Sequence, residues 1–157
     1  MANIKQAFGT STSITITLNS LASSATAGRE STAIDNSSDL FLDALVTVIL
    51  NVGAGTIAND KCAYVYAYGS EDGTNLTDNA TGSDAAITLN APTNLRLVHV
   101  IAMPTASLTY KAVFSIAAAF GGVLPRKWGI VVRNYCGIAL NSSGNSATYS
   151  GVYATSS

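Results

Sequence analysis

The sequence predicts an all-β fold, an antiparallel β-sandwich of about eight strands with little helix. Runs of β-prone residues recur along the chain, separated by turn residues every ~8–12 positions. No stretch of useful length shows the 3.6-residue period of an amphipathic helix. The number of strands and the unequal loops favour a jelly-roll-like arrangement. The length of 157 residues fits one domain, which we place at residues 13–157, after a flexible or docking N-terminal arm at residues 1–12.

The strands expected in the first half of the chain are defined by alternation and by β-branched residues. In residues 61–69, Tyr64, Tyr66 and Tyr68 alternate with smaller residues, which places the three rings on one face of a strand. Residues 40–51 end in a β-branched run before a glycine-rich stop, which favours a strand over a helix. The strands expected in this half are residues 13–18, a short segment at 30–34, 40–51 and 61–69.

The second half continues the same pattern. Residues 108–116 alternate apolar and polar positions, and residues 128–134 form the continuous apolar run of a buried strand. Residues 117–120 are short and fit one helical turn before two glycines. The strands expected here are residues 86–90, 95–103, 108–116, 128–134, with a continuation or restart at 137–140, and 147–154.

The low content of charged residues limits the partners that we expect for this chain. Only 11% of the residues are charged and the net charge is −1, so nucleic acid and anionic membranes are not expected partners. No apolar run is long enough to span a bilayer, and the start of the chain lacks a secretory signal. We therefore expect a soluble protein made in the cytosol. A weakly charged surface is poorly protected against association, which favours a homo-oligomer.

Few residues are suited to catalysis. The chain has one histidine, His99, inside an apolar run and without a visible catalytic partner. A nucleophile elbow and a phosphate-binding loop are both missing from the sequence. We expect no enzyme, no catalytic residues and no cofactor.

Metal binding is not expected either. Residues Glu71, Asp72, Asp78 and Asp84 lie in one loop and could supply oxygen ligands to calcium, but their spacing is not that of an EF-hand. A solvated loop is the favoured interpretation. Cys62 and Cys136 form no CxxC pair, so we expect two small buried residues. A disulfide between them requires neighbouring strands, which the spacing leaves open.

The candidate interface residues are mainly aromatic. The tyrosine face at positions 64, 66 and 68 is either a sugar-stacking or protein-binding patch, or a packed face of the sandwich. Trp128, near Arg126, is either a contact hot spot or a plug at the end of the sandwich. Ile4 and Phe8 lie in the N-terminal arm, which could order on docking.

Several segments together resemble small structural proteins of tailed bacteriophages. They are residues 40–45 (LFLDAL), 124–134 (LPRKWGIVVRN), 137–140 (GIAL) and 149–153 (YSGVY). The chain is most similar to capsid decoration, or cement, proteins, which are small, β-rich and weakly charged. The resemblance implies a non-enzymatic virion protein on the outer head surface that binds the major capsid protein. It also implies an oligomer, with a trimer favoured. No contact residues of that family can be matched one by one.

Two alternatives remain. The first is a carbohydrate-binding or adhesive module of a head fibre or tail, which would use the tyrosine face. The second is a component of the tail tube or tail tip, within the same structural class.

Overall fold

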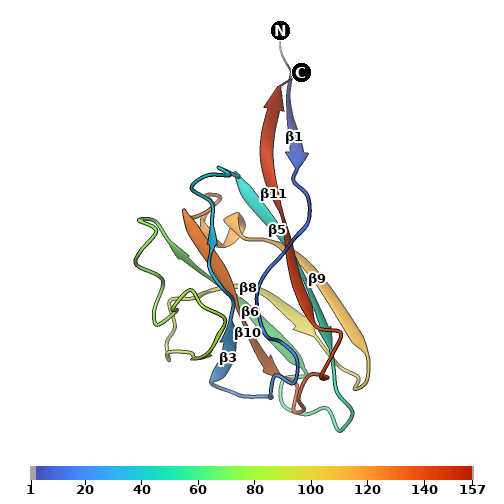
Figure 1. Ribbon diagram of the computed structural model, residues 1–157. Helices are drawn as coiled ribbons and strands as arrows, with labels where there is room; N and C mark the ends of the chain where they lie inside the picture. The colour runs from blue at the N-terminus through green and yellow to red at the C-terminus, as the bar shows by residue number, and fades with distance from the viewer. Residues whose placement is uncertain (1–2, 157) are drawn as a thin grey trace.

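The computed structural model describes residues 3–156, and it confirms an all-β sandwich of two antiparallel sheets (Figure 1). The first sheet has the order β1 (Ile4–Phe8), β11 (Ser146–Ser156), β5 (Asp43–Asn51) and β9 (Thr109–Ser115), and β2 (Thr12–Ser13) also pairs with β11. The second sheet has the order β7 (Ala85–Thr88), β3 (Ala27–Glu30), β10 (Lys127–Tyr135), β6 (Cys62–Ser70) and β8 (Arg96–Ala102), and β4 (Ile34–Asp35) also pairs with β10.

The strand order is that of a jelly roll. Counting β1 with β2 as the first strand and β3 with β4 as the second, the main strands continue through β5, β6, β8, β9, β10 and β11. In that numbering one sheet reads 1-8-3-6 and the other 2-7-4-5, the interleaved order of two Greek keys. Strand β7 lies in the connection from β6 to β8 and adds an edge strand beside β3.

The main core lies between the sheets and follows from alternation in β5. Inward residues of this strand, such as Val46 and Val48, are fully buried, whereas the residues between them are partly exposed. Strands β6 and β10 are paired along their whole length and supply the core residues of the second sheet, such as Val65 and Ile130. Trp128 is 1% exposed and meets the ring of Tyr149 edge-on, with 5.3 Å between centroids. Burying these side chains is the main favourable term in folding.

A second, smaller core lies on the outer side of the second sheet. The connection from β6 to β8 packs Ile87, Leu89 and Leu95 against Tyr66 and Tyr68. Glu30, buried at 1% exposure, fastens this connection to β3. Its carboxylate accepts hydrogen bonds from the backbone N–H of Thr81 at 2.9 Å and from the Thr81 hydroxyl at 2.6 Å. The connection is therefore a packed layer.

Several regions differ from the strands that the sequence predicts. The strand expected at residues 30–34 is replaced by the end of β3 and the start of β4, and the one expected at residues 40–51 begins only at Asp43. Residues 137–140 form a single bridge, between Leu140 and Val52. In residues 13–18, Ile14 and Leu18 are buried as the alternation predicts, but Thr12 and Ser13 alone form a ladder. Residues 4–8 form β1, which the sequence does not predict, whereas Met1 and Ala2 of the proposed arm lie outside the described residues. The helical turn expected at residues 117–120 is confirmed as η1 (Ala117–Phe120).

We predict that Asn134→Ala lowers the free energy of unfolding by about 2–3 kcal/mol. The Asn134 side chain is fully buried and donates to the carbonyls of Leu21 and Ile138 at 3.0 and 2.8 Å. Its oxygen accepts the N–H of Cys136 at 3.2 Å. Urea unfolding measures the change, with exposed Asn90→Ala as the control. Equal stabilities of the two variants would show that this network contributes little.

Candidate functional site

The most prominent surface feature is a two-stranded ribbon that projects from the sandwich. Strand β1 pairs with the last residues of β11, from Phe8 opposite Val152 to Ile4 opposite Ser156. On the other side of β11, strand β5 begins at Asp43, opposite Val152. Residues 153–156 therefore extend beyond the sheet with β1 as their ladder partner, as Figure 1 shows at the top of the molecule.

The ribbon and the segment before β5 are unusually apolar for an exposed surface. Five side chains are exposed there, and we call them the ribbon surface: Ile4 (81% exposed), Leu40 (71%), Leu42 (60%), Phe8 (55%) and Tyr153 (39%). Ile4, Leu42 and Tyr153 line one open groove of about 550 Å³, and Leu40 and Tyr153 line a second beside it. Clustered apolar exposure of this kind marks interaction sites on soluble proteins.

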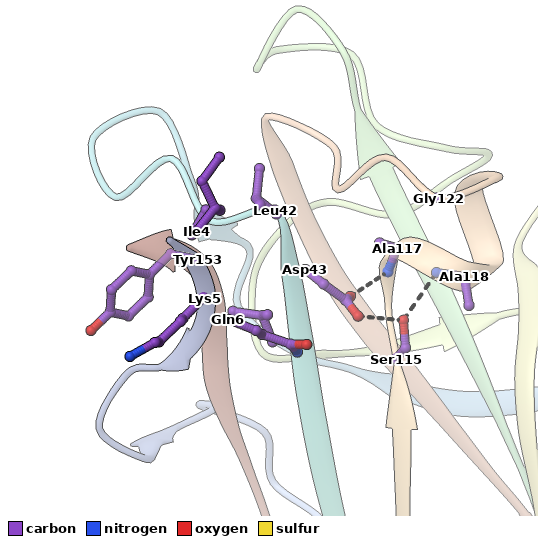
Figure 2. A pocket seen from close by; sticks show the side chains of 12 residues that line it. Ile4, Lys5, Gln6, Leu42, Asp43, Ser115, Ala117, Ala118, Gly122 and Tyr153 are labelled. Atoms are coloured by element: carbon purple, nitrogen blue, oxygen red, sulfur yellow. Dashed lines mark hydrogen bonds between the residues drawn. The ribbon is translucent and has the colours of Figure 1, made fainter. Parts of the chain in front are cut away.

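The floor of the larger groove is held by Asp43. Its carboxylate accepts the Ser115 hydroxyl at 2.7 Å and the backbone N–H of Ala117 at 2.8 Å. The Ser115 oxygen in turn accepts the N–H of Ala118 at 3.1 Å. Figure 2 shows these bonds tying the start of β5 to the start of η1, with Gln6 and Leu42 across the groove. These bonds hold the start of η1 against the start of β5, and the Asp43 carboxylate is committed to the protein's own donors.

A close approach of chain segments also shapes the ribbon's base. The aromatic ring of Phe41 lies directly against Gly151 of β11, where a Cβ atom would collide with it. From there the Phe41 ring contacts Tyr153, with 6.2 Å between centroids. Glycine at position 151 thus lets Phe41 reach the ribbon and support the exposed Tyr153 ring.

The three tyrosines do share one face of β6, as the sequence predicts, but they do not form an open platform. Tyr68 is fully buried and donates its hydroxyl hydrogen to the carbonyl of Ser31 at 2.6 Å, and burial raises the pKa of this phenol. Tyr66 is 9% exposed. Tyr64 keeps a partly exposed ring, but the Arg133 guanidinium lies 4.3 Å from its centroid and covers one side. The layer formed by the β6–β8 connection hides the rest.

Of the remaining candidate residues, Trp128 is buried, whereas Arg126, Ile4 and Phe8 are exposed. Trp128 belongs to the main core, as expected of a residue that plugs the end of the sandwich. Its indole ring is buried and is not available for a contact. Arg126 is exposed in the turn before β10. Of the predicted interface residues, the structure places Ile4 and Phe8 on the ribbon surface. Sequence patterns missed Leu40 and Leu42, which fall inside the strand expected at residues 40–51.

Asp72 and Asp78, in the β6–β8 connection, accept hydrogen bonds from different parts of that connection. Asp72 accepts hydrogen bonds from Asn75, Thr74 and Ser70, which lower its pKa by stabilising the carboxylate. Asp78 accepts bonds from Thr93 and Asn94. Within residues 3–156 no three metal-ligating side chains gather at one place. These carboxylates fasten loops and do not converge on a calcium ion.

Asp84, just before β7, forms an ion pair with Arg29 of β3. It is more buried than the pair between Lys127 and Asp35. Burial raises the pKa of the Asp84 carboxyl, but hydrogen bonds from Arg29 and Thr17 outweigh that effect and lower it to about 2. The Arg29 and Asp84 side chains are 25% and 19% exposed. Their pairing links β3, the segment before β7 and the N-terminal segment around Thr17.

His99 and the two cysteines pack against other parts of the protein. His99 stacks on Phe114, with 5.7 Å between ring centroids. Cys62 and Cys136 are both buried and free, so the expectation of two small buried residues is confirmed and they are not joined by a disulfide. Burial raises the pKa of the Cys62 thiol, which keeps it protonated and unreactive.

Comparisons with known proteins do not supply an identity. No protein-family model matches the chain, and no curated protein or solved structure shows significant similarity to it. In the part of the chain that the structure describes, no helix has the length and apolar character needed to cross a membrane.

We predict that the stabilising effect of Asp84 disappears in acid. Because its pKa is lower in the folded state than the ordinary value of 3.8, the carboxylate stabilises the fold above that value and loses the effect as pH falls through about 2. Asp84→Asn should therefore cost roughly 2 kcal/mol at about pH 6 and progressively less towards pH 2. Urea unfolding of both proteins across this range measures the difference. A difference that is independent of pH would contradict the assignment.

Proposed function

We propose that this chain is a non-enzymatic structural protein of a bacteriophage particle, a capsid decoration subunit that binds the outer head surface as an oligomer and stabilises the shell. The observation that carries the proposal is the ribbon surface, because four of its five exposed apolar side chains line two adjoining grooves: Ile4, Leu40, Leu42 and Tyr153. Its partners would be the major capsid protein and other copies of this chain, for which the resemblance favours three.

The chemistry of the ribbon surface suits a protein partner. The larger groove has mostly apolar walls, formed by residues such as Leu42, Val152 and Tyr153, and its one carboxylate is satisfied internally. Covering such a surface removes apolar area from water, which is favourable by roughly 25 cal/mol per Å² before the cost of association. The low charge of the chain keeps the desolvation cost of such contacts small.

The rigidity of the body supports a bracing role. The grooves lie at the end of a jelly roll whose strands are paired across two sheets, so a contact there joins a stiff domain to its partner. Jelly rolls occur in capsid and in lectin domains among others, so the fold is compatible with the proposal and does not decide it. The carbohydrate-binding alternative loses its main support, because Tyr66 and Tyr68 are buried.

We predict that Leu42→Asp abolishes binding to heads assembled from the major capsid protein encoded in the same genome. A carboxylate on the ribbon surface would have to lose its hydration shell when the surface is covered. Cosedimentation with undecorated heads measures binding, and the temperature at which the heads release DNA or disassemble measures stabilisation.

The matched control is Leu108→Asp. Leu108 is 50% exposed, compared with 60% for Leu42, and it lies just before β9, at the end of that strand away from the ribbon. The control protein should bind and stabilise heads as the unmodified chain does. Unmodified protein that neither binds heads nor raises their heat resistance would overturn the proposed function.

A further inference from the structure

The part of β11 that lies in the ribbon has a free backbone edge. The carbonyl of Gly151 accepts the N–H of Gly9 on the β1 side, at 2.8 Å, and the carbonyl of Val152 accepts the N–H of Leu42 on the β5 side, at 2.7 Å. Because these directions alternate along a strand, Ala154 and Ser156 direct their N–H and C=O groups to the β5 side. Strand β5 begins at Asp43, opposite Val152, and does not extend beside them, and among residues 3–156 no other strand pairs on this side.

This edge has no charge, proline or bulge to block pairing, and residues 39–42 face Tyr153 and Ala154 across an open groove. Exposed edges are normally blocked by charged side chains, proline, a bulge or a covering segment. The ribbon part of β11 reads Tyr-Ala-Thr-Ser, and all four residues are exposed. A two-stranded ribbon is also only marginally stable in water without further strands. The edge is therefore open to a third strand, and the ribbon would be stabilised by receiving one.

We propose that this third strand is the same edge of a second copy of the chain. The two β11 strands would run antiparallel around a two-fold axis at Thr155 and form a four-stranded ribbon in the order β1, β11, β11, β1. Ala154 would exchange both backbone hydrogen bonds with Ser156 of the second copy, and Thr155 would face its own counterpart. The inference rests on the proposed function for its oligomer, and it predicts pairs of copies in place of the trimer that the resemblance favours.

Charge explains why this edge, and not that of β1, suits a two-fold contact. A two-fold axis brings each side chain near its own copy, so a charge close to the axis would be repelled. The outer strand β1 contains Lys5, opposite Thr155, whereas residues 153–156 contain no charge. In the four-stranded ribbon the two Lys5 backbones lie three strand spacings apart, roughly 14 Å, which exceeds the Debye length of about 8 Å at physiological salt.

The geometry also leaves room for both domains. Each sandwich begins at Val152, three residues from the axis at Thr155. The two Val152 residues would therefore be separated by six residue steps along the ribbon, roughly 20 Å. The sandwiches lie at opposite ends of the shared ribbon, and facing threonines form a favourable cross-strand pair. Such a contact joins copies in pairs, so the mass of the oligomer distinguishes it from the trimer that the resemblance favours.

We predict that Thr155→Cys forms a disulfide-linked dimer under mild oxidation. Facing residues of a non-hydrogen-bonded pair have Cα atoms about 4.5 Å apart, within the range that a disulfide spans. The native Cys62 and Cys136 are buried, so they should contribute little background. Non-reducing electrophoresis over time gives the rate of cross-linking, which we expect to be about tenfold that of the control.

The matched control is Gln6→Cys, at an exposed position of the same ribbon but on the outer strand β1. Adding Ala154→Pro to Thr155→Cys should reduce cross-linking to the control rate, because proline removes an N–H that the pairing uses and the single copy does not. Faster linking of Gln6→Cys, equal rates for the two single variants, or no effect of the proline would each overturn the two-fold pairing.

Head binding separates this inference from the proposed function. If Thr155→Cys fails to link but the unmodified chain still binds and stabilises heads, the pairing is wrong and the decoration role stands. If the linked dimer forms and neither it nor the unmodified chain binds heads, the pairing is retained and the decoration role falls. A third strand contributed by the capsid protein would appear as cross-linking that requires heads, which would also overturn pairing between copies.

Discussion

The pairing of β11 with β5 is the interaction on which the other features of the molecule depend. Strand β11 pairs with β5 from Ser146 to Val152, and on its other side with β2 and β1. This places β11, the last of the eight main strands, beside β5, the third of them, and closes the jelly roll. Because β11 continues past the start of β5, the same pairing creates the ribbon, its grooves and its free edge. A β5 longer at its beginning by four residues would remove all three.

The distribution of charge follows from the same architecture. Several carboxylates lie where loops must be fastened. Asp43 joins β5 to η1, Asp72 closes a turn, and Glu30 and Asp84 hold the layer that covers the tyrosines. These four carboxylates therefore serve the fold, because each accepts hydrogen bonds from the protein's own donors.

Sequence patterns predict the strands well where burial alternates, as in β5 and β6, because each residue's direction follows from its position. They miss β1, whose five residues carry no clear pattern and whose partner Val152–Ser156 lies at the far end of the sequence. The burial of Tyr66 and Tyr68 depends on a layer fastened by Glu30 through Thr81, a contact across 51 positions. Ile4 and Phe8 stand out in the sequence as isolated apolar residues, whereas Leu40 and Leu42 are exposed because β5 begins only at Asp43.

The continuity of β11 through ribbon and sandwich has a mechanical consequence. Residues 146–152 lie inside the first sheet and residues 153–156 lie in the ribbon, so both belong to one covalent strand. A force that pulls the ribbon away from the body acts along β11, parallel to its neighbours β2 and β5. It therefore loads their hydrogen bonds together in shear, and none can open singly as in a zipper. A contact made at the ribbon would therefore pull on the domain in the direction in which its sheet is strongest.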